Sequence, residues 1–195
     1  CLKSAQEAFK DKSNNQLILQ SLELAAELYE SNQAELMSLA MREAGKTYQD
    51  AIDEVREAVD FLRYYANLAQ RVIPKKREAL GIFVCISPWN FPLAIFTGQV
   101  AAALSAGNVV IAKPAESTSL IAYRATQLLL EAGIPLGIFQ LTLGEGPDVG
   151  SYLASHPSIA GVAFTGSTRV AKLIKHNLVV NGNTKARVIA ETGGL

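Results

Sequence analysis

Several residue types that define whole classes of protein are scarce in this chain. Cysteine occurs twice in 195 residues, at Cys1 and Cys85, and histidine twice, at His156 and His176. Thiols and imidazoles so few and so far apart predict neither a disulfide framework nor a metal site, and they suit a reducing, cytoplasmic compartment. An excess of one charge is also missing, because 18 basic residues balance 18 acidic ones. We therefore expect a small molecule or another protein chain, and not nucleic acid, as the partner.

Long apolar segments and the common dinucleotide fingerprint are missing too. The longest apolar run, Phe91 to Ala106, is shorter than the roughly 20 residues that a membrane-spanning helix needs, so no membrane insertion is expected. The N-terminus carries no signal-peptide pattern. The pattern G-x-G-x-x-G is absent from the first strand-to-helix turn, so a phosphate group would have to bind elsewhere. Because the chain begins without Met and stops directly after a strand-like run, at Glu191 to Leu195, we interpret it as a piece of a longer protein.

The N-terminal part has the spacing of amphipathic helices. Apolar residues recur every three or four positions up to about residue 70, which predicts one helix through Ile18 to Tyr29, one from Asn32 to Gly45 and one from Thr47 onwards. Glu35 and Asp50 stand three residues after Asn32 and Thr47, which is the spacing of a capping box. Residues 1–80 are therefore expected to be packing helices that end in a linker.

From residue 81 onwards, strands and helices alternate. The basic connector at 71–79 precedes this part, and its four basic residues between neutral flanks favour a solvated linker over a nucleic-acid patch. The expected strands are 82–86, 108–112, 138–142, 160–164 and 187–190, and the expected helices are 93–106, 118–132, 147–154 and 168–179. Strands this apolar, joined by helical crossovers, predict an α/β fold: N-terminal helices and a five-stranded doubly wound parallel (Rossmann-like) sheet in the order 3-2-1-4-5.

Polar residues at the expected strand ends are the candidates for chemistry. Asn90 lies in a loop that two prolines stiffen, and Pro92 suits the first position of the following helix. A carboxamide N–H in such a loop can stabilise an oxyanion, and Glu191, at the end of the last strand and beside two glycines, can act as a general base. Cys85 lies inside a strand, which favours a buried structural side chain, so the sequence contains no evident nucleophile.

Three turns could hold a nucleotide. Gly166 and Ser167 follow a strand and open a helix, which suits a phosphate oxygen or an ordinary helix cap. Lys113 and Glu116 follow the second strand and could bind ribose hydroxyls, in which case Glu116 would repel the 2′-phosphate of NADP; an exposed pair beside a helix start is the alternative. The turn that contains Gly146, with Gly150 beyond it, permits close approach of an adenine ring or is simply tight.

These segments, in this order and spacing, closely resemble motifs of the aldehyde dehydrogenase superfamily. The motifs are Pro88-Trp89-Asn90-Phe91-Pro92, Ala112-Lys113-Pro114-Ala115-Glu116, Phe164-Thr165-Gly166-Ser167-Thr168 and Glu191-Thr192-Gly193-Gly194. The resemblance extends over essentially the whole chain. Within the superfamily, residues 85–99 and 189–194 look most like the L-glutamate γ-semialdehyde (1-pyrroline-5-carboxylate) dehydrogenase part of the bifunctional enzymes of proline catabolism. The resemblance implies an incomplete NAD-binding domain at 81–195, truncated before the catalytic domain.

The resemblance also implies a role for each candidate residue. Asn90 would hold the oxyanion, and Glu191 would be the general base that hydrolyses the acyl-enzyme. Lys113 and Glu116 would bind the adenosine ribose of NAD. The pyrophosphate would meet Gly166 and Ser167, and the cofactor cleft would be lined by Ile86, Trp89, Gly146, Gly150 and Phe164. The chain departs from the family at Ala171, where many members carry glycine.

The family's nucleophilic cysteine lies beyond the Glu-x-Gly-Gly motif, where this chain stops. The resemblance therefore implies a parent enzyme that oxidises a small-molecule aldehyde, and a piece that is inactive alone. The parent would be a homo-oligomer, and FAD would be needed only if a proline dehydrogenase domain lies elsewhere in the parent chain. An aldehyde dehydrogenase of different substrate range, or a non-catalytic nucleotide-binding module, would share the same motifs.

Overall fold

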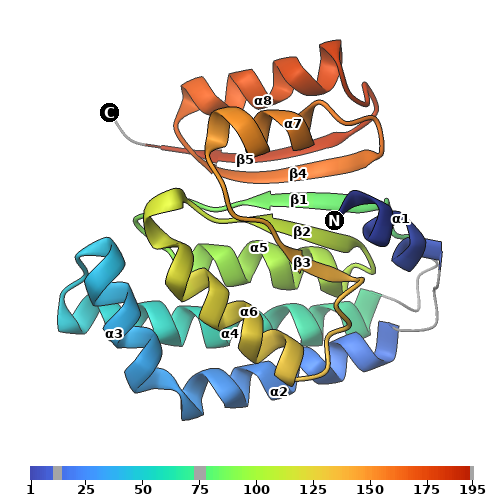
Figure 1. The fold of residues 1–195 in the computed structure, drawn as a ribbon. Coiled ribbons are helices and arrows are strands. Elements are labelled where there is room, and N and C mark those ends of the chain that lie inside the picture. Colours follow the sequence, from blue (N-terminus) through green and yellow to red (C-terminus); the bar gives the residue numbers. More distant parts are fainter. Residues whose placement is uncertain (11–14, 73–77, 194–195) are drawn as a thin grey trace.

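A computed structural model describes residues 1–10, 15–72 and 78–193 as helices packed on both faces of one sheet (Figure 1). The α-helices are α1 (Leu2–Lys10), α2 (Asn15–Ser31), α3 (Gln33–Ala44), α4 (Tyr48–Val72), α5 (Ala94–Ser105), α6 (Ser119–Glu131), α7 (Ser151–Ala154) and α8 (Thr168–Val180). The strands are β1 (Ile82–Ile86), β2 (Val109–Lys113), β3 (Phe139–Leu141), β4 (Ile159–Gly166) and β5 (Arg187–Thr192). Short turns η2 (Glu116–Thr118) and η3 (Gly146–Gly150) precede α6 and α7.

The strands form one parallel sheet in the order β3-β2-β1-β4-β5. This order confirms the doubly wound arrangement predicted from the sequence. The chain moves outwards from β1 to β3, returns past β1, and moves outwards again through β4 to β5. The carboxyl ends of β1 and β4 therefore lie side by side at the switch point of the sheet, where ligands bind in folds of this kind.

Alternation along the strands divides the core into two layers. Phe83, Cys85 and Val110 point towards α5 and α6, behind which α2, α3 and α4 pack in the same hydrophobic cluster. Val84 and Ile111 point to the opposite face, into a cluster with α1, α7 and α8. Successive strand residues project to opposite faces, so both faces of these strands are buried, as their continuous apolar runs predict. Because the N-terminal helices share a core with the sheet, the division at residue 80 stays a prediction.

The main differences from the expected elements lie at the chain start and at one crossover. Helix α1 was not predicted, and it covers β1 and β2 on the face of α7 and α8, where Ala5 is fully buried. The helix expected at 147–154 is a short π-helical turn followed by α7. Strand β2 runs one residue further than expected and so includes Lys113. Residues 73–77 of the basic connector lie outside the described residues.

Helix starts show which local predictions were right. The capping box of α4 is confirmed: Thr47 Oγ1 donates to the Asp50 carboxylate over 2.7 Å and accepts from the Asp50 N–H over 3.2 Å. The box predicted at Asn32 is wrong, because its amide oxygen accepts from Arg124 instead of capping α3. Pro92 is not the first residue of α5, which begins at Ala94.

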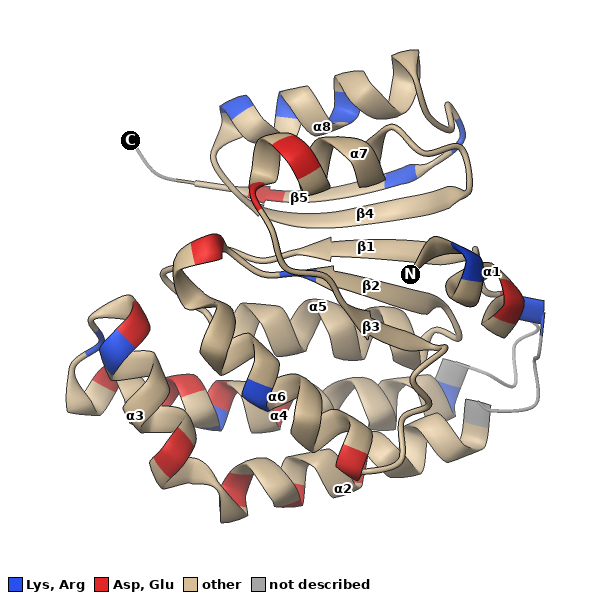
Figure 2. Ribbon diagram, in the orientation of Figure 1, with Lys and Arg blue, Asp and Glu red and all other residues tan. Residues whose placement is uncertain are grey.

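Figure 2 shows that residues of both charge signs are distributed over the helices of the two layers. Two ion pairs join helices that are distant in sequence, Arg63 with Glu30 at 2.7 Å and Arg124 with Glu35 at 2.8 Å. Among the described residues, no helix combines the length and the apolar composition that crossing a membrane requires. Within the same residues, no group of His, Cys, Asp and Glu side chains has the geometry of a metal site.

Candidate active site

The carboxyl ends of three neighbouring strands place candidate residues in one row. Ile86 pairs with Lys113 on β2 and with Phe164 on β4. Residues paired in a parallel sheet project to the same face. Phe164 packs in the cluster of α7 and α8, with Ile86 partly buried against it. These three side chains therefore lie on the α7 side of the sheet.

Lys113 and Glu116 form an ion pair at the end of β2. Lys113 is only 3% exposed, and its Nζ lies 3.0 Å from Glu116 Oε1 and 3.0 Å from the carbonyl oxygen of Pro114. The N–H of Gly146 donates to the same Glu116 oxygen over 2.6 Å. Partial burial raises the pKa of Glu116, but hydrogen bonds from its own N–H, from Lys113 and from Gly146 outweigh burial and hold the pKa below its usual value.

The glycines of the η3 turn border this ion pair. A Cβ at Gly146 would lie 3.7 Å from Glu116 Oε1, and a Cβ at Gly150 would lie 3.8 Å from Lys113 Cδ. Both distances are ordinary contacts, so a larger side chain would occupy the space beside the pair. Four residues from the end of β2, from η2 and from η3 therefore meet in one place, as the sequence interpretation requires of a ribose site. Their role as such stays a prediction.

The turn from β4 into α8 is built around a glycine. A Cβ at Gly166 would lie 2.6 Å from the ring of Phe164, so no larger residue fits there without moving that ring. Ser167 is the N-cap of α8, and its Oγ accepts from the N–H of Val170 over 3.3 Å. The helix-cap alternative is thus observed, and it leaves the N–H groups of Thr168 and Arg169 pointing out of the helix end, where an anion is favoured.

The two catalytic candidates come from the loop after β1 and from β5. Asn90 is exposed in the loop after β1, and its side chain makes no hydrogen bond within the described residues. Trp89, next to it, is 57% exposed. Glu191 pairs with Thr165 and therefore projects to the α5 side of the sheet, opposite to the row of Ile86, Lys113 and Phe164. The side chains of Lys113 and Glu191 thus lie on opposite faces of the sheet.

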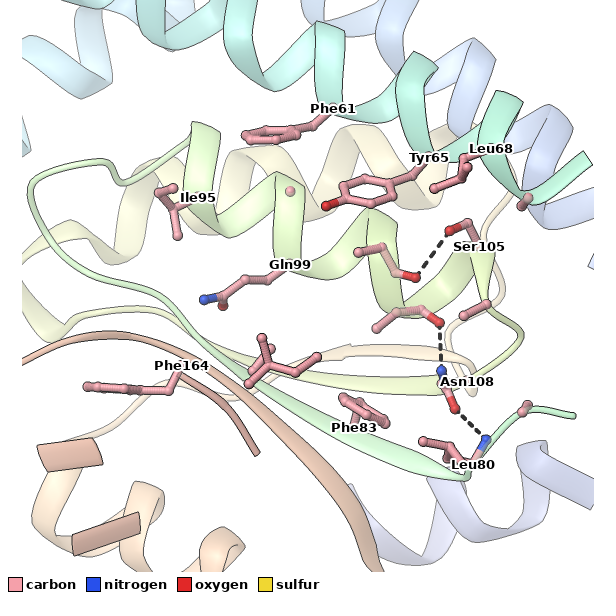
Figure 3. Close-up of a pocket in the computed structure, with 18 of the residues that line it drawn as sticks. Phe61, Tyr65, Leu68, Leu80, Phe83, Ile95, Gln99, Ser105, Asn108 and Phe164 are labelled. Atoms are coloured by element: carbon pink, nitrogen blue, oxygen red, sulfur yellow. Dashed lines mark hydrogen bonds between the residues drawn. The ribbon is translucent and has the colours of Figure 1, made fainter. Parts of the chain in front are cut away.

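Glu191 borders a cavity of about 820 Å³ between α4, α5 and the sheet. Figure 3 shows Phe61 and Tyr65 entering from α4 and Ile95 and Gln99 from α5, above Phe83 and Phe164 of the strands. The lining is mainly apolar. Among its polar residues, Gln99 joins α5 to the sheet, because its Nε2 donates to the Thr165 hydroxyl over 3.1 Å and to the Ile86 carbonyl over 3.3 Å.

Sequence reasoning missed Gln99, and a signal was present. A single amide within an otherwise apolar helix has to find buried partners, and the strand ends of β1 and β4 supply them. Its Oε1 is buried and has no hydrogen-bond partner within the described residues. The side chain therefore links the ends of β1 and β4, the strands on which Ile86 and Thr165 lie.

The remaining cysteine and histidines have structural surroundings. Cys85 is 1% exposed, and burial raises the pKa of its thiol to about 12. This agrees with the predicted inert side chain. The His156 Nδ1 lies 2.5 Å from the Ser158 hydroxyl within one turn, and His176 is exposed on α8.

Comparison with known proteins gives a consistent result. The family model described as "Aldehyde dehydrogenase family" matches residues 1–195. The bifunctional protein PutA of Klebsiella aerogenes is 54% identical over 178 residues, which cover 89% of this chain and 14% of that protein. A 2,5-dioxopentanoate dehydrogenase of Saccharolobus solfataricus is 38% identical, over 87% of this chain and 38% of the relative. The crystal structure of a 1-pyrroline-5-carboxylate dehydrogenase from Thermus with bound NAD has a TM-score of 0.93 and 35% identity, over 99% of this chain and 41% of that one.

Proposed function

This chain belongs to the aldehyde dehydrogenase family, and we propose that it is part of an NAD-dependent enzyme of proline catabolism. The enzyme would oxidise L-glutamate γ-semialdehyde, the open form of 1-pyrroline-5-carboxylate, to glutamate. The chain spans 14% of the PutA relative and 41% of the Thermus dehydrogenase. The activity therefore belongs to the longer protein. The 54% identity to a PutA supports this substrate over others.

The observation that carries the proposal is the cluster at the end of β2. Lys113 presents a buried ammonium group beside a carboxylate, and Gly146 and Gly150 keep the adjoining space free of side chains. These groups fit a ribose, since the carboxylate can accept from its hydroxyls and the ammonium can donate to them. The negative charge of Glu116 disfavours a 2′-phosphate, which supports NAD over NADP. Ile86, Trp89 and Phe164 would contact the rest of the dinucleotide, and the start of α8 at Gly166 and Ser167 would take its phosphates.

Bound NAD would supply the hydride acceptor for the oxidation. The residues of this chain would act on the substrate side. Asn90 would donate its amide N–H to the aldehyde oxygen as negative charge develops there. Glu191 would take a proton from the water that hydrolyses the thioester intermediate, which forms on a cysteine contributed by the longer protein. The proposal assigns neither Cys1 nor Cys85 a catalytic part, and for Cys85 the high thiol pKa supports this.

The setting of the parent enzyme is part of the proposal. We propose a homo-oligomer in the cytoplasm, and the free thiols of Cys1 and Cys85 fit a reducing compartment. FAD would be bound only if a proline dehydrogenase domain is present in the same protein, as the word "bifunctional" in the names of the PutA relatives suggests.

The test is a substrate comparison with the longer enzyme. NADH formation would be followed with 1-pyrroline-5-carboxylate and with 2,5-dioxopentanoate, the substrate that the Saccharolobus relative is named for. The proposal predicts a higher kcat/KM for the first. A higher value for the second would replace the substrate but keep the reaction, whereas no NAD-dependent oxidation of either would favour a non-catalytic nucleotide-binding module.

A further inference from the structure

The buried carboxylate of Glu54, on α4, contacts the end of the loop that carries Asn90. Glu54 is 1% exposed. Its Oε1 accepts from the N–H of Leu93 and from the N–H of Ala94, each over 3.0 Å. These are the first donors of α5, and no side chain of the loop itself caps them. A helix that is 39 residues away in the sequence therefore supplies the cap.

Lys46 compensates this buried charge and contacts the same loop on its other side. The Nζ of Lys46 lies 2.8 Å from Glu54 Oε2 as an ion pair, and Oε2 has no aligned hydrogen-bond partner within the described residues. The same Nζ lies 4.0 Å from the centre of the Phe91 ring. A cation at that distance over an aromatic face is attracted to it. The loop is thus held at Phe91 by Lys46 and at Leu93 and Ala94 by Glu54.

Asn90 is the residue next to Phe91, and its own side chain makes no hydrogen bond within the described residues. Its position is therefore set by the backbone on either side. On the β1 side, the N–H of Ser87 donates to the carbonyl of Lys113 over 3.3 Å. On the α5 side, the fixed points are those that Lys46 and Glu54 provide.

We propose that Lys46 and Glu54 are positioning residues that hold Asn90 in its productive place for aldehyde oxidation. The inference rests on the proposed function of Asn90. The pair touches neither the expected cofactor row nor Glu191, so it acts through the loop alone. It also gives the N-terminal helices a part in the chemistry that packing by itself does not.

The chain contains a matched control. Glu43, on α3, is partly buried and also caps a helix of the sheet layer, α6, with Oε1 accepting from Leu120 over 3.0 Å and Oε2 from Ile121 over 2.7 Å. Both carboxylates cap a helix of the sheet layer from a helix of the outer layer. Only Glu54 caps the helix that follows Asn90. Glu43→Gln therefore weakens another cap between the two layers without reaching the Asn90 loop.

The experiment is a mutant cycle in the longer enzyme. Glu54→Gln is expected to lower kcat about 10- to 100-fold, because a shift of about 1 Å in a reacting group is enough for such a loss, with KM for NAD nearly unchanged. In the Asn90→Ala background the same change should lower kcat by less than about twofold, since the group to be positioned is gone. Lys46→Met should behave like Glu54→Gln, and Lys46→Arg, which keeps the cation, should recover most of the loss.

Effects of Glu54→Gln and Asn90→Ala that simply multiply would overturn the proposal, as would an equal loss of kcat in Glu43→Gln. If Glu54→Gln does not fold, the more exposed Lys46 carries the same cycle. Hydrogen exchange at the amides of Leu93 and Ala94 gives a readout that is independent of activity. Faster exchange there in Lys46→Met than in Glu43→Gln supports the network even if the wild-type enzyme oxidises no aldehyde, and equal exchange counts against it.

Discussion

Lys113 and Glu116 are the residues that we propose bind the ribose of NAD. The ammonium group is buried, and the carboxylate beside it is about half exposed, so one partner is fixed while the other faces the solvent. A ligand hydroxyl can reach the exposed carboxylate without breaking the pair. The arrangement is therefore suited to recognition more than to stability, because an ion pair with one exposed partner stabilises a fold only slightly.

The variant Glu116→Gln tests whether this carboxylate contributes to NAD binding. The amide keeps the shape but loses the charge that accepts from ribose hydroxyls, so KM for NAD should rise about tenfold in the longer enzyme while kcat changes little. Steady-state rates at varied NAD would show it, with Glu145→Gln, one residue before Gly146, as the control. A fall in kcat at unchanged KM would place Glu116 in the chemistry instead.

The pH dependence of the same residue has a defined sign. The folded-state pKa of Glu116 lies below the usual value of 4.5. A depressed pKa contributes stability that is present above the unfolded-state pKa and is lost as the pH falls through the folded value. NAD binding through this carboxylate should therefore be constant between about pH 7 and pH 5, and calorimetry across that range should show no loss attributable to it.

Cys85 provides a prediction that needs no enzyme assay. Its thiol is buried with a pKa of about 12, whereas Cys1 is exposed. A thiol reagent such as a disulfide dye should modify only Cys1 in the native chain and both residues in denaturant. Cys1→Ser should abolish the native reaction. Rapid labelling of Cys85 without denaturant would contradict the packing of β1.

At the scale of elements, the sequence predicted the sheet better than the helix ends. Continuous apolar runs predict strands that are buried on both faces of the sheet. Right-handed crossovers between them then leave few possible strand orders. The caps of α5 and α6 could not be foreseen in this way, since Glu54 and Glu43 reach them from distant helices. Helix α1 was missed for a similar reason: its buried residue, Ala5, is covered only because the sheet is there.

The candidate site also has parts that the sequence predicts and parts that it does not. Motif residues and their strand ends were predictable, because each motif follows a strand. The placement of Glu191 on the opposite face from Lys113 depends on the register between β4 and β5, which only the structure supplies. Gln99 and Glu54 belong to no local motif, and they connect the motifs to one another.

Gly161 shows how closely the central strands pack. A Cβ there would lie 2.2 Å from the ring of Phe83 on the neighbouring strand. Gly161→Ala should therefore force that ring to move and lower the free energy of unfolding by about 1–3 kcal/mol. Thermal or urea denaturation would measure it, with Gly193→Ala as the control because no atom lies within 4 Å of a Cβ at that position. Equal stability of both variants would disprove the register at Phe83.

At the scale of the whole molecule, the β5 side of the sheet is open. All six residues of β5 are exposed, and Ile189, at 54% exposed, borders the apolar cavity that Glu191 also borders. An edge strand and an apolar surface in one place favour association with another chain. This is the side on which the Glu191 base would have to meet the rest of a longer enzyme.

The 195-residue chain alone should therefore bind a hydrophobic dye and self-associate. Ile189→Lys should reduce both effects, because a charge on an edge strand opposes pairing. Val179→Lys, on α8 and equally exposed at 54%, is the matched control and should change neither by much. Dye fluorescence and light scattering at several concentrations would compare the three. Identical dye binding and light scattering of the two variants would show that the chain does not associate through the β5 side.

The most direct test of the central claim is pre-steady-state NADH formation by the longer enzyme carrying Glu191→Gln, with 1-pyrroline-5-carboxylate as substrate. If Asn90 and the cofactor row support oxidation and Glu191 serves the later hydrolysis, about one NADH per active site should form rapidly and turnover should then nearly stop. Slow NADH formation without that rapid phase would contradict this division of roles between Asn90 and Glu191.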